Sequence, residues 1–187
     1  TPKIQFNSPR LSLQDIAGKE YVEAVCRAGA FLHGLPTREL RRVATRKVSF
    51  FPVDLQRRLS AQLEHVGTLC IRALRESSSG ATSVQFEQNS HTEQAPLSAF
   101  GYCRTGENGR LYLTSKSEHY HVPLGHSFPG YELVSLAKSL GVPNATHNNT
   151  RGHLTRFLEE ELILAANGAD RSNLEALLAS EEPGILN

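Results

Sequence analysis

The feature that most constrains the fold of this chain is the segment from Asn108 to Gly130, NGRLYLTSKSEHYHVPLGHSFPG. It begins with Asn108-Gly109, two residue types that supply the positive φ angles needed by a tight turn. Residues 110–114 (RLYLT) alternate and are rich in strand formers, so they predict one short strand. A loop with Gly125, His126 and Pro129 then precedes an amphipathic pattern, which predicts that a helix begins at the proline.

Imidazole and aromatic side chains are concentrated inside this segment, at His119, Tyr120 and His121. This composition favours the wall of a binding pocket, and the alternative is an exposed surface loop. A metal site is a second hypothesis, because His119 and His121 share one face if the segment is extended and His126 or His147 could complete the ligand set. No acidic or cysteine partner has a recognisable ligand spacing, so we predict no metal site.

Helical patterns precede and follow this segment. Ser12 and Asp15 form a capping pair for a helix that Gly34 ends, and Thr37 begins a short second helix. Asp54 is positioned as the N-cap of a long helix, whose apolar stripe is predicted to continue to Leu74. Further helices are expected over 131–140, 154–165 and 173–179. The imidazole of His126 is expected to tie its loop to backbone carbonyls.

The middle of the chain has strand-like patterns. Residues 82–87 alternate between apolar and polar side chains, and 97–104 read as a second strand beside the strand at 110–114. The fold class predicted from these patterns is α+β, with a helical N-terminal half, a small antiparallel sheet and a helical C-terminal third. We expect two regions, a helical one over residues 1–80 and an α+β one over residues 81–187.

Composition restricts the class of protein further. The chain has 187 residues, a formal net charge of +1 and 39% hydrophobic residues, with no apolar run long enough to span a bilayer and no secretory signal pattern. We therefore expect a cytoplasmic protein. Its three cysteines are odd in number and widely spaced, which disfavours a disulfide framework.

The order Asn108-Gly109-Arg110, Tyr112, Gly125-His126-x-x-Pro129 and an amphipathic helix resembles the N-terminal lobe of class III pyridoxal-phosphate-dependent aminotransferases, the ornithine and ω-amino-acid type. The resemblance covers residues 106–187 and implies part of a fold-type I lobe. The chain departs from the family at Thr114, where an aspartate is usual. The role of that carboxylate is therefore not carried over.

The resemblance also implies site residues and partners. His119 and Tyr120 would contact the substrate, and a loop of hydroxyl, amide and guanidinium donors would lie near the cofactor phosphate, at His147, Asn148, Thr150 and Arg151. The implied cofactor is pyridoxal phosphate, the substrates are an amine and a keto acid or aldehyde, and the assembly is a homodimer. No catalytic residue is assigned. The phosphate loop, the aspartate that pairs with the pyridine nitrogen and the Schiff-base lysine are expected in the remainder of a longer parent enzyme.

The alternative is a non-enzymatic α+β protein-interaction module, in which residues 11–77 bind a protein partner. Its surface would include the basic residues Arg38, Arg41, Arg42, Arg46, Lys47, Arg57 and Arg58. We expect these to face solvent or acidic protein groups. Neither nucleic acid nor a membrane is expected as a partner, because a formal net charge of +1 gives no global field to attract either. Against nucleic acid, the rest of the chain is also not basic and lacks stacking aromatics on an exposed strand.

Overall fold

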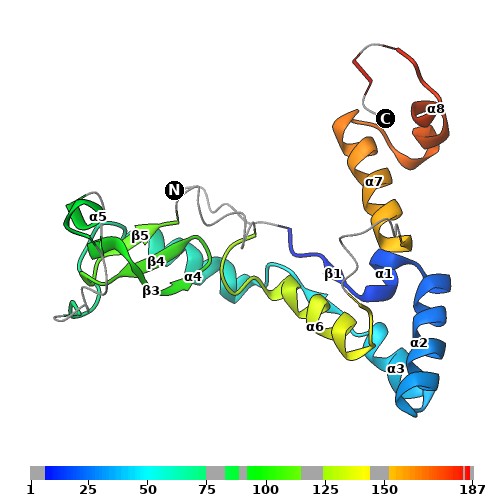
Figure 1. Ribbon diagram of the computed structural model, residues 1–187, viewed down its shortest axis with the longest axis horizontal. Helices are drawn as coiled ribbons and strands as arrows, with labels where there is room; N and C mark the ends of the chain where they lie inside the picture. The colour runs from blue at the N-terminus through cyan, green and yellow to red at the C-terminus, as the bar shows by residue number, and fades with distance from the viewer. Residues whose placement is uncertain are drawn as a thin grey trace. The chain divides into compact units, whose positions relative to one another are not determined.

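The computed structural model describes residues 7–74, 83–88, 92–114, 124–143, 152–182 and 184–185. The chain divides into two compact units, each built from two chain segments. Unit 1 comprises Thr1–Leu11 and Lys47–Glu132, and unit 2 comprises Ser12–Arg46 and Leu133–Asn187. The division predicted from the sequence is sequential, into residues 1–80 and 81–187, and stays a prediction. Helices and small antiparallel sheets occur together, so the predicted α+β class is confirmed (Figure 1).

Unit 1 contains two small antiparallel sheets. Strands β1 (Arg10–Leu11) and β2 (Val48–Ser49) form the first, and β3 (Pro96–Phe100), β4 (Cys103–Gly106) and β5 (Leu111–Leu113) form the second in the order β3-β4-β5 (Figure 1). The described part of the unit also contains α4 (Val53–Leu63), α5 (Val84–Gln88) and the 3-10 turns η1 (Thr92–Gln94) and η3 (Pro129–Tyr131).

The turn between β4 and β5 is the one predicted from Asn108-Gly109. Gly109 has φ = 78°, and its carbonyl accepts hydrogen bonds from the N–H groups of Cys70 and Ile71 at 2.9 and 3.2 Å. The strand predicted over 110–114 is confirmed as β5. The segment after α4 lies beside this turn and the start of β5. The N–H of Gly67 donates to the Leu111 carbonyl at 2.8 Å, and Leu69 forms an antiparallel bridge with Arg110.

Predictions about three segments of this unit are wrong. Asp54 is not the N-cap of α4: Pro52 is, and the helix ends at Leu63 instead of continuing to Leu74. Where a strand was expected over 82–87, the described residues from Val84 onward belong to the helix α5. The expected strand over 97–104 is a hairpin, because Gly101 has φ = 57° and turns the chain between β3 and β4.

Unit 2 is helical, and its first helical segment begins after Ser12 and ends at Gly34, as the sequence indicated. Helix α1 (Leu13–Ala17) has a capping box between Ser12 and Asp15, and α2 (Lys19–His33) ends at Gly34 in the left-handed conformation. Gly18, with φ = 85°, separates the two helices, which the sequence had predicted as one. Among the residues that the structure describes, this unit also contains α3 (Thr37–Ala44), α6 (Glu132–Ser139), α7 (His153–Ala166), η4 (Arg171–Asn173) and α8 (Leu174–Leu178).

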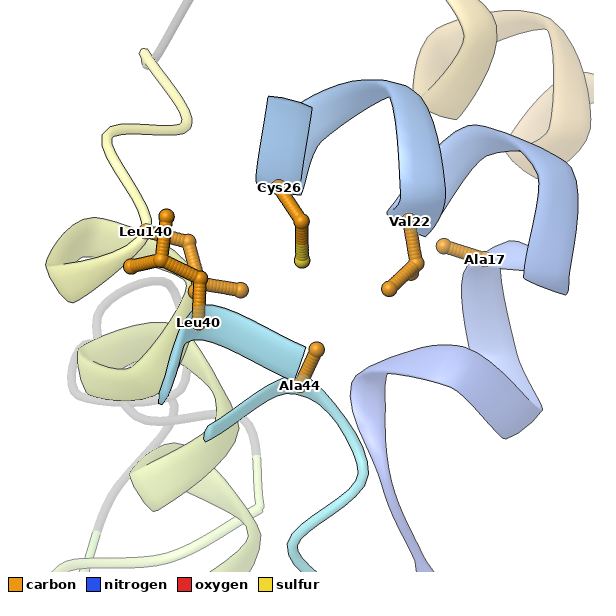
Figure 2. Packing of buried hydrophobic residues seen from close by; sticks show 6 residues of the cluster. All are labelled: Ala17, Val22, Cys26, Leu40, Ala44 and Leu140. Atoms are coloured by element: carbon orange, nitrogen blue, oxygen red, sulfur yellow. The ribbon is translucent and has the colours of Figure 1, made fainter. Parts of the chain in front are cut away.

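The core of unit 2 lies where α1, α2, α3 and the end of α6 converge. Figure 2 shows its buried members, Ala17, Val22, Cys26, Leu40, Ala44 and Leu140. Gly29 permits this close approach, since a Cβ atom there would lie 3.0 Å from the carbonyl oxygen of Leu140 and 3.3 Å from Cδ1 of Leu40. The apolar stripe of α2 therefore packs on α3 and on Leu140, directly after α6.

Candidate functional site

The loop that carries Gly125, His126 and Pro129 is fixed to the three-stranded sheet by backbone hydrogen bonds. Gly101 N–H donates to the His126 carbonyl at 2.7 Å, and His126 N–H donates to the Gly101 carbonyl at 2.8 Å. Gly125 has φ = 89°, and a Cβ atom there would lie 3.0 Å from the Gly101 oxygen. The sequence assigned this anchoring to the imidazole, but the bridge to Gly101 is made by backbone groups.

An aromatic cluster follows the loop. The ring of Phe128, which is buried, lies 5.4 Å from Phe50, 5.2 Å from Phe51 and 5.3 Å from Tyr131, measured between centroids. Pro129 begins η3, so the predicted start of the helical segment is confirmed. The cluster joins residues far apart in sequence, and no local pattern could have identified it. It fixes the chain on the C-terminal side of His126.

The residues assigned to substrate and cofactor cannot be placed in this way. His119 and Tyr120, the proposed substrate contacts, lie outside the described residues, as do His147, Asn148, Thr150 and Arg151, the proposed cofactor contacts. His121, of the metal hypothesis, also lies outside them. These assignments stay predictions.

A half-open pocket of about 270 Å³ lies within unit 2 and was not predicted. One wall comes from α1 and α2, through Leu13, Ile16, Ala17, Tyr21, Val22 and Val25. The other comes from α6, the turn after it and the first turn of α7, through Leu133, Val134, Ala137, Leu140, Val142 and Leu154. All accessible atoms of the lining are apolar. The apolar stripes were visible in the sequence, but which helices face one another was not.

His153 connects α7 to the first wall of the pocket. Its imidazole stacks on the ring of Tyr21, with centroids 4.6 Å apart and planes inclined by 14°. Its Nε2 lies 2.9 Å from the carbonyl oxygen of Ala17, and because a carbonyl only accepts, Nε2 carries the proton and donates it. This pair of contacts connects the end of α1, the start of α2 and the start of α7.

Two arginines in unit 2 make multiple ion-pair hydrogen bonds. Arg41 of α3 binds Glu23 of α2 through Nε and Nη2, at 2.8 and 2.7 Å, and these bonds hold the pKa of Glu23 below its usual range. Arg171 binds Glu161 and Glu160, and hydrogen bonding to both raises the pKa of its guanidinium. Both arginines are extensively exposed, so they fix local geometry more than they stabilise the fold.

The described residues contain no group of three or more histidine, cysteine or acidic side chains placed to hold a metal ion. Among the helices of that same part of the chain, none combines the length and apolar character needed to cross a membrane. No protein-family model matches the sequence, and neither a curated protein nor a solved structure is significantly similar to it.

Proposed function

We propose that this chain is the N-terminal part of a class III-like, pyridoxal-phosphate-dependent aminotransferase. In this proposal it contributes to the substrate pocket and the homodimer interface and is not catalytic alone. The observation that carries the proposal is the double hydrogen bond between Gly101 and His126. It places the Gly-His-x-x-Pro loop against the turn of an antiparallel sheet that contains the Asn-Gly hairpin, so the motifs behind the family resemblance form one structural unit.

The described residues do not by themselves fit the cofactor. Lys19, Lys47 and Lys138 are all exposed, whereas a lysine that forms a Schiff base is activated by an enclosed, desolvated setting or a neighbouring cation. Lys3 and Lys116 lie outside the described residues. We therefore derive no catalytic step and assign the cofactor to the parent protein, where Thr150 and Arg151 would contribute donors to its phosphate.

The proposal is tested by the coding sequence downstream of Asn187 and by cofactor binding. We expect the reading frame to continue into a Ser/Thr-Gly-rich loop at a helix N-terminus, followed by an aspartate and a lysine. A protein that includes this continuation should show Schiff-base absorbance with pyridoxal phosphate. Borohydride should trap no site-specific adduct on the 187-residue chain alone. A specific adduct on that chain, or a stop codon directly after Asn187, would contradict the proposal.

Substitutions at the proposed substrate contacts add a kinetic test in the longer protein. Tyr120→Phe and His119→Ala should raise KM for the amine while leaving the Schiff-base absorbance unchanged, because they would remove contacts to substrate and not to cofactor. Ser117→Ala in the same segment is the matched control. Unchanged kinetics in both variants would remove these residues from the pocket.

A second candidate function is supported by exposed apolar side chains in unit 2. Phe31 and Leu32, at the end of α2, have exposed fractions of 88% and 71%, and Leu35 follows in the connection to α3. Such surfaces are typical of protein interfaces. They favour a non-enzymatic interaction module whose helical half binds a protein, and the stop codon that would contradict the first proposal would support this one.

A further inference from the structure

We propose that the pocket of unit 2 is a binding site for a neutral hydrocarbon group about the size of one substituted aromatic ring. This inference does not depend on the proposed aminotransferase function. It rests on the volume, the lining and the rigidity of the pocket.

The lining determines the chemical class of the ligand. Every accessible lining atom is apolar, so a water molecule inside finds no hydrogen-bond partner in the wall. A charged or strongly hydrogen-bonding ligand would lose its hydration without replacement, and its burial is therefore disfavoured. A neutral hydrocarbon loses no hydrogen bonds and gains dispersion contacts with the wall. The pocket should consequently bind neutral, apolar ligands and exclude charged ones.

The volume determines the size of the ligand. Engineered apolar cavities of about 150 Å³ are sufficient to bind benzene. The pocket here has about 270 Å³, which accommodates one ring with a short alkyl substituent. Its floor is closed by the buried side chains of Ala17, Val22 and Leu140, while Ile16, Val134 and Leu154 stand partly exposed at its rim. A ligand would therefore enter from the rim and cover apolar surface that now faces solvent.

The walls are fixed without a ligand. Gly18, with φ = 85°, sets the angle between α1 and α2, and His153 holds both helices through Ala17 and Tyr21. A pocket whose walls are already ordered loses little conformational freedom when a ligand binds. Binding should thus occur with small changes in the protein.

The test is titration of the 187-residue chain with toluene, followed by NMR of the Tyr21 ring and by thermal unfolding. We expect saturable shifts of the Tyr21 resonances and a melting temperature that rises with toluene concentration, because the ligand binds the folded state. Benzoate and benzylamine, which carry a charge on a similar ring, should produce neither effect.

Two variants locate the site. Ala137→Leu fills the pocket from α6 and should weaken toluene binding at least tenfold, whereas Ala166→Leu, on an exposed position of α7 outside the pocket, should leave it unchanged. Leu154→Asn places a polar group at the rim and should weaken binding too, which keeps the test valid if Ala137→Leu fails to fold.

The proposal is overturned if toluene gives no saturable shift, if both pocket variants bind normally, or if the charged analogues bind equally well. Concentration-dependent self-association that Ala137→Leu abolishes would also overturn it, since a second copy would then be the occupant.

Discussion

At the scale of single residues, Gly109 shows how one position can determine a whole turn. Its positive φ is unfavourable for residues with a side chain, and a Cβ atom there would lie only 2.1 Å from the carbonyl oxygen of Ile71. The same glycine carbonyl binds Cys70 and Ile71, so the segment after α4 is held directly against the turn. The residue therefore has both a conformational and a packing role.

Replacing Gly109 with alanine should destabilise unit 1 by about 2–4 kcal/mol, from the left-handed backbone and the loss of one or two hydrogen bonds. The matched control is Gly168→Ala, because Gly168 also has positive φ but no atom within 4 Å of an added Cβ. It should lose only the backbone contribution, about 1–2 kcal/mol. Urea unfolding measures both, and equal losses would show that the contact with Ile71 is unimportant.

The three cysteines should differ sharply in reactivity. Cys26 and Cys103 are buried and burial raises the pKa of each thiol, whereas Cys70 is exposed. We expect an aromatic disulfide reagent to modify Cys70 quickly at neutral pH and the other two only after unfolding. In a Cys70→Ser variant only Cys26 and Cys103 remain, and their rapid modification would show that they are not buried.

The raised pKa of the Cys26 thiol also gives the stability of unit 2 a pH dependence. A thiol with a higher pKa in the folded state favours folding below its ordinary pKa, about 8.5, and this contribution is lost as pH rises above it. The free energy of unfolding should therefore fall above pH ~8.5, and the fall should be smaller in Cys26→Ala than in the parent chain when compared by urea titration.

At the scale of elements, the sequence predicted helix ends better than strand pairing. Ser12 and Gly34 act through local hydrogen bonds and backbone conformation, and both predictions are confirmed. The prediction of a strand over 82–87 was wrong because a few residues that alternate between apolar and polar side chains fit a short helix as well as a strand. The prediction that the helix continues beyond Leu63 to Leu74 was wrong because that segment makes backbone hydrogen bonds with the turn around Gly109. Only the tertiary structure provides this partner.

The candidate site shows the same limit. The loop around His126 was identified from Gly125 and Pro129, whose backbone preferences are local. The bridge to Gly101 and the pocket in unit 2 depend on which elements meet in space. Single-sequence patterns predict apolar faces but not their partners, so neither could be predicted from the sequence.

Helix α3 provides an electrostatic prediction at this scale. Arg38 lies in its first turn, where the helix dipole disfavours a cation, and Arg42 lies one turn further along the same face. Arg38→Glu should raise the free energy of unfolding by about 0.5–1.5 kcal/mol, because a carboxylate there interacts favourably with both the dipole and Arg42. Arg38→Gln should give a smaller gain. Both gains should shrink in 1 M salt, and a loss of stability at low salt would contradict this reasoning.

At the scale of the whole molecule, the two units have separate apolar clusters. Unit 1 has the rings around Phe128, and unit 2 has the core around Cys26 and Leu40. No residue is shared between these clusters. A change in one cluster therefore acts on the interactions of its own unit.

Calorimetry should accordingly resolve two unfolding transitions, since a chain with two cores need not unfold in one step. Leu40→Ala removes a side chain that is 4% exposed and should lower the transition of unit 2 by the equivalent of about 2–5 kcal/mol. Phe128→Ala should lower the other transition, by about 3–5 kcal/mol. Far-UV circular dichroism should report mainly the helical transition of unit 2, and Leu40→Ala should shift it while Phe128→Ala should not. A single transition that both substitutions shift equally would mean that the two units unfold as one cooperative body.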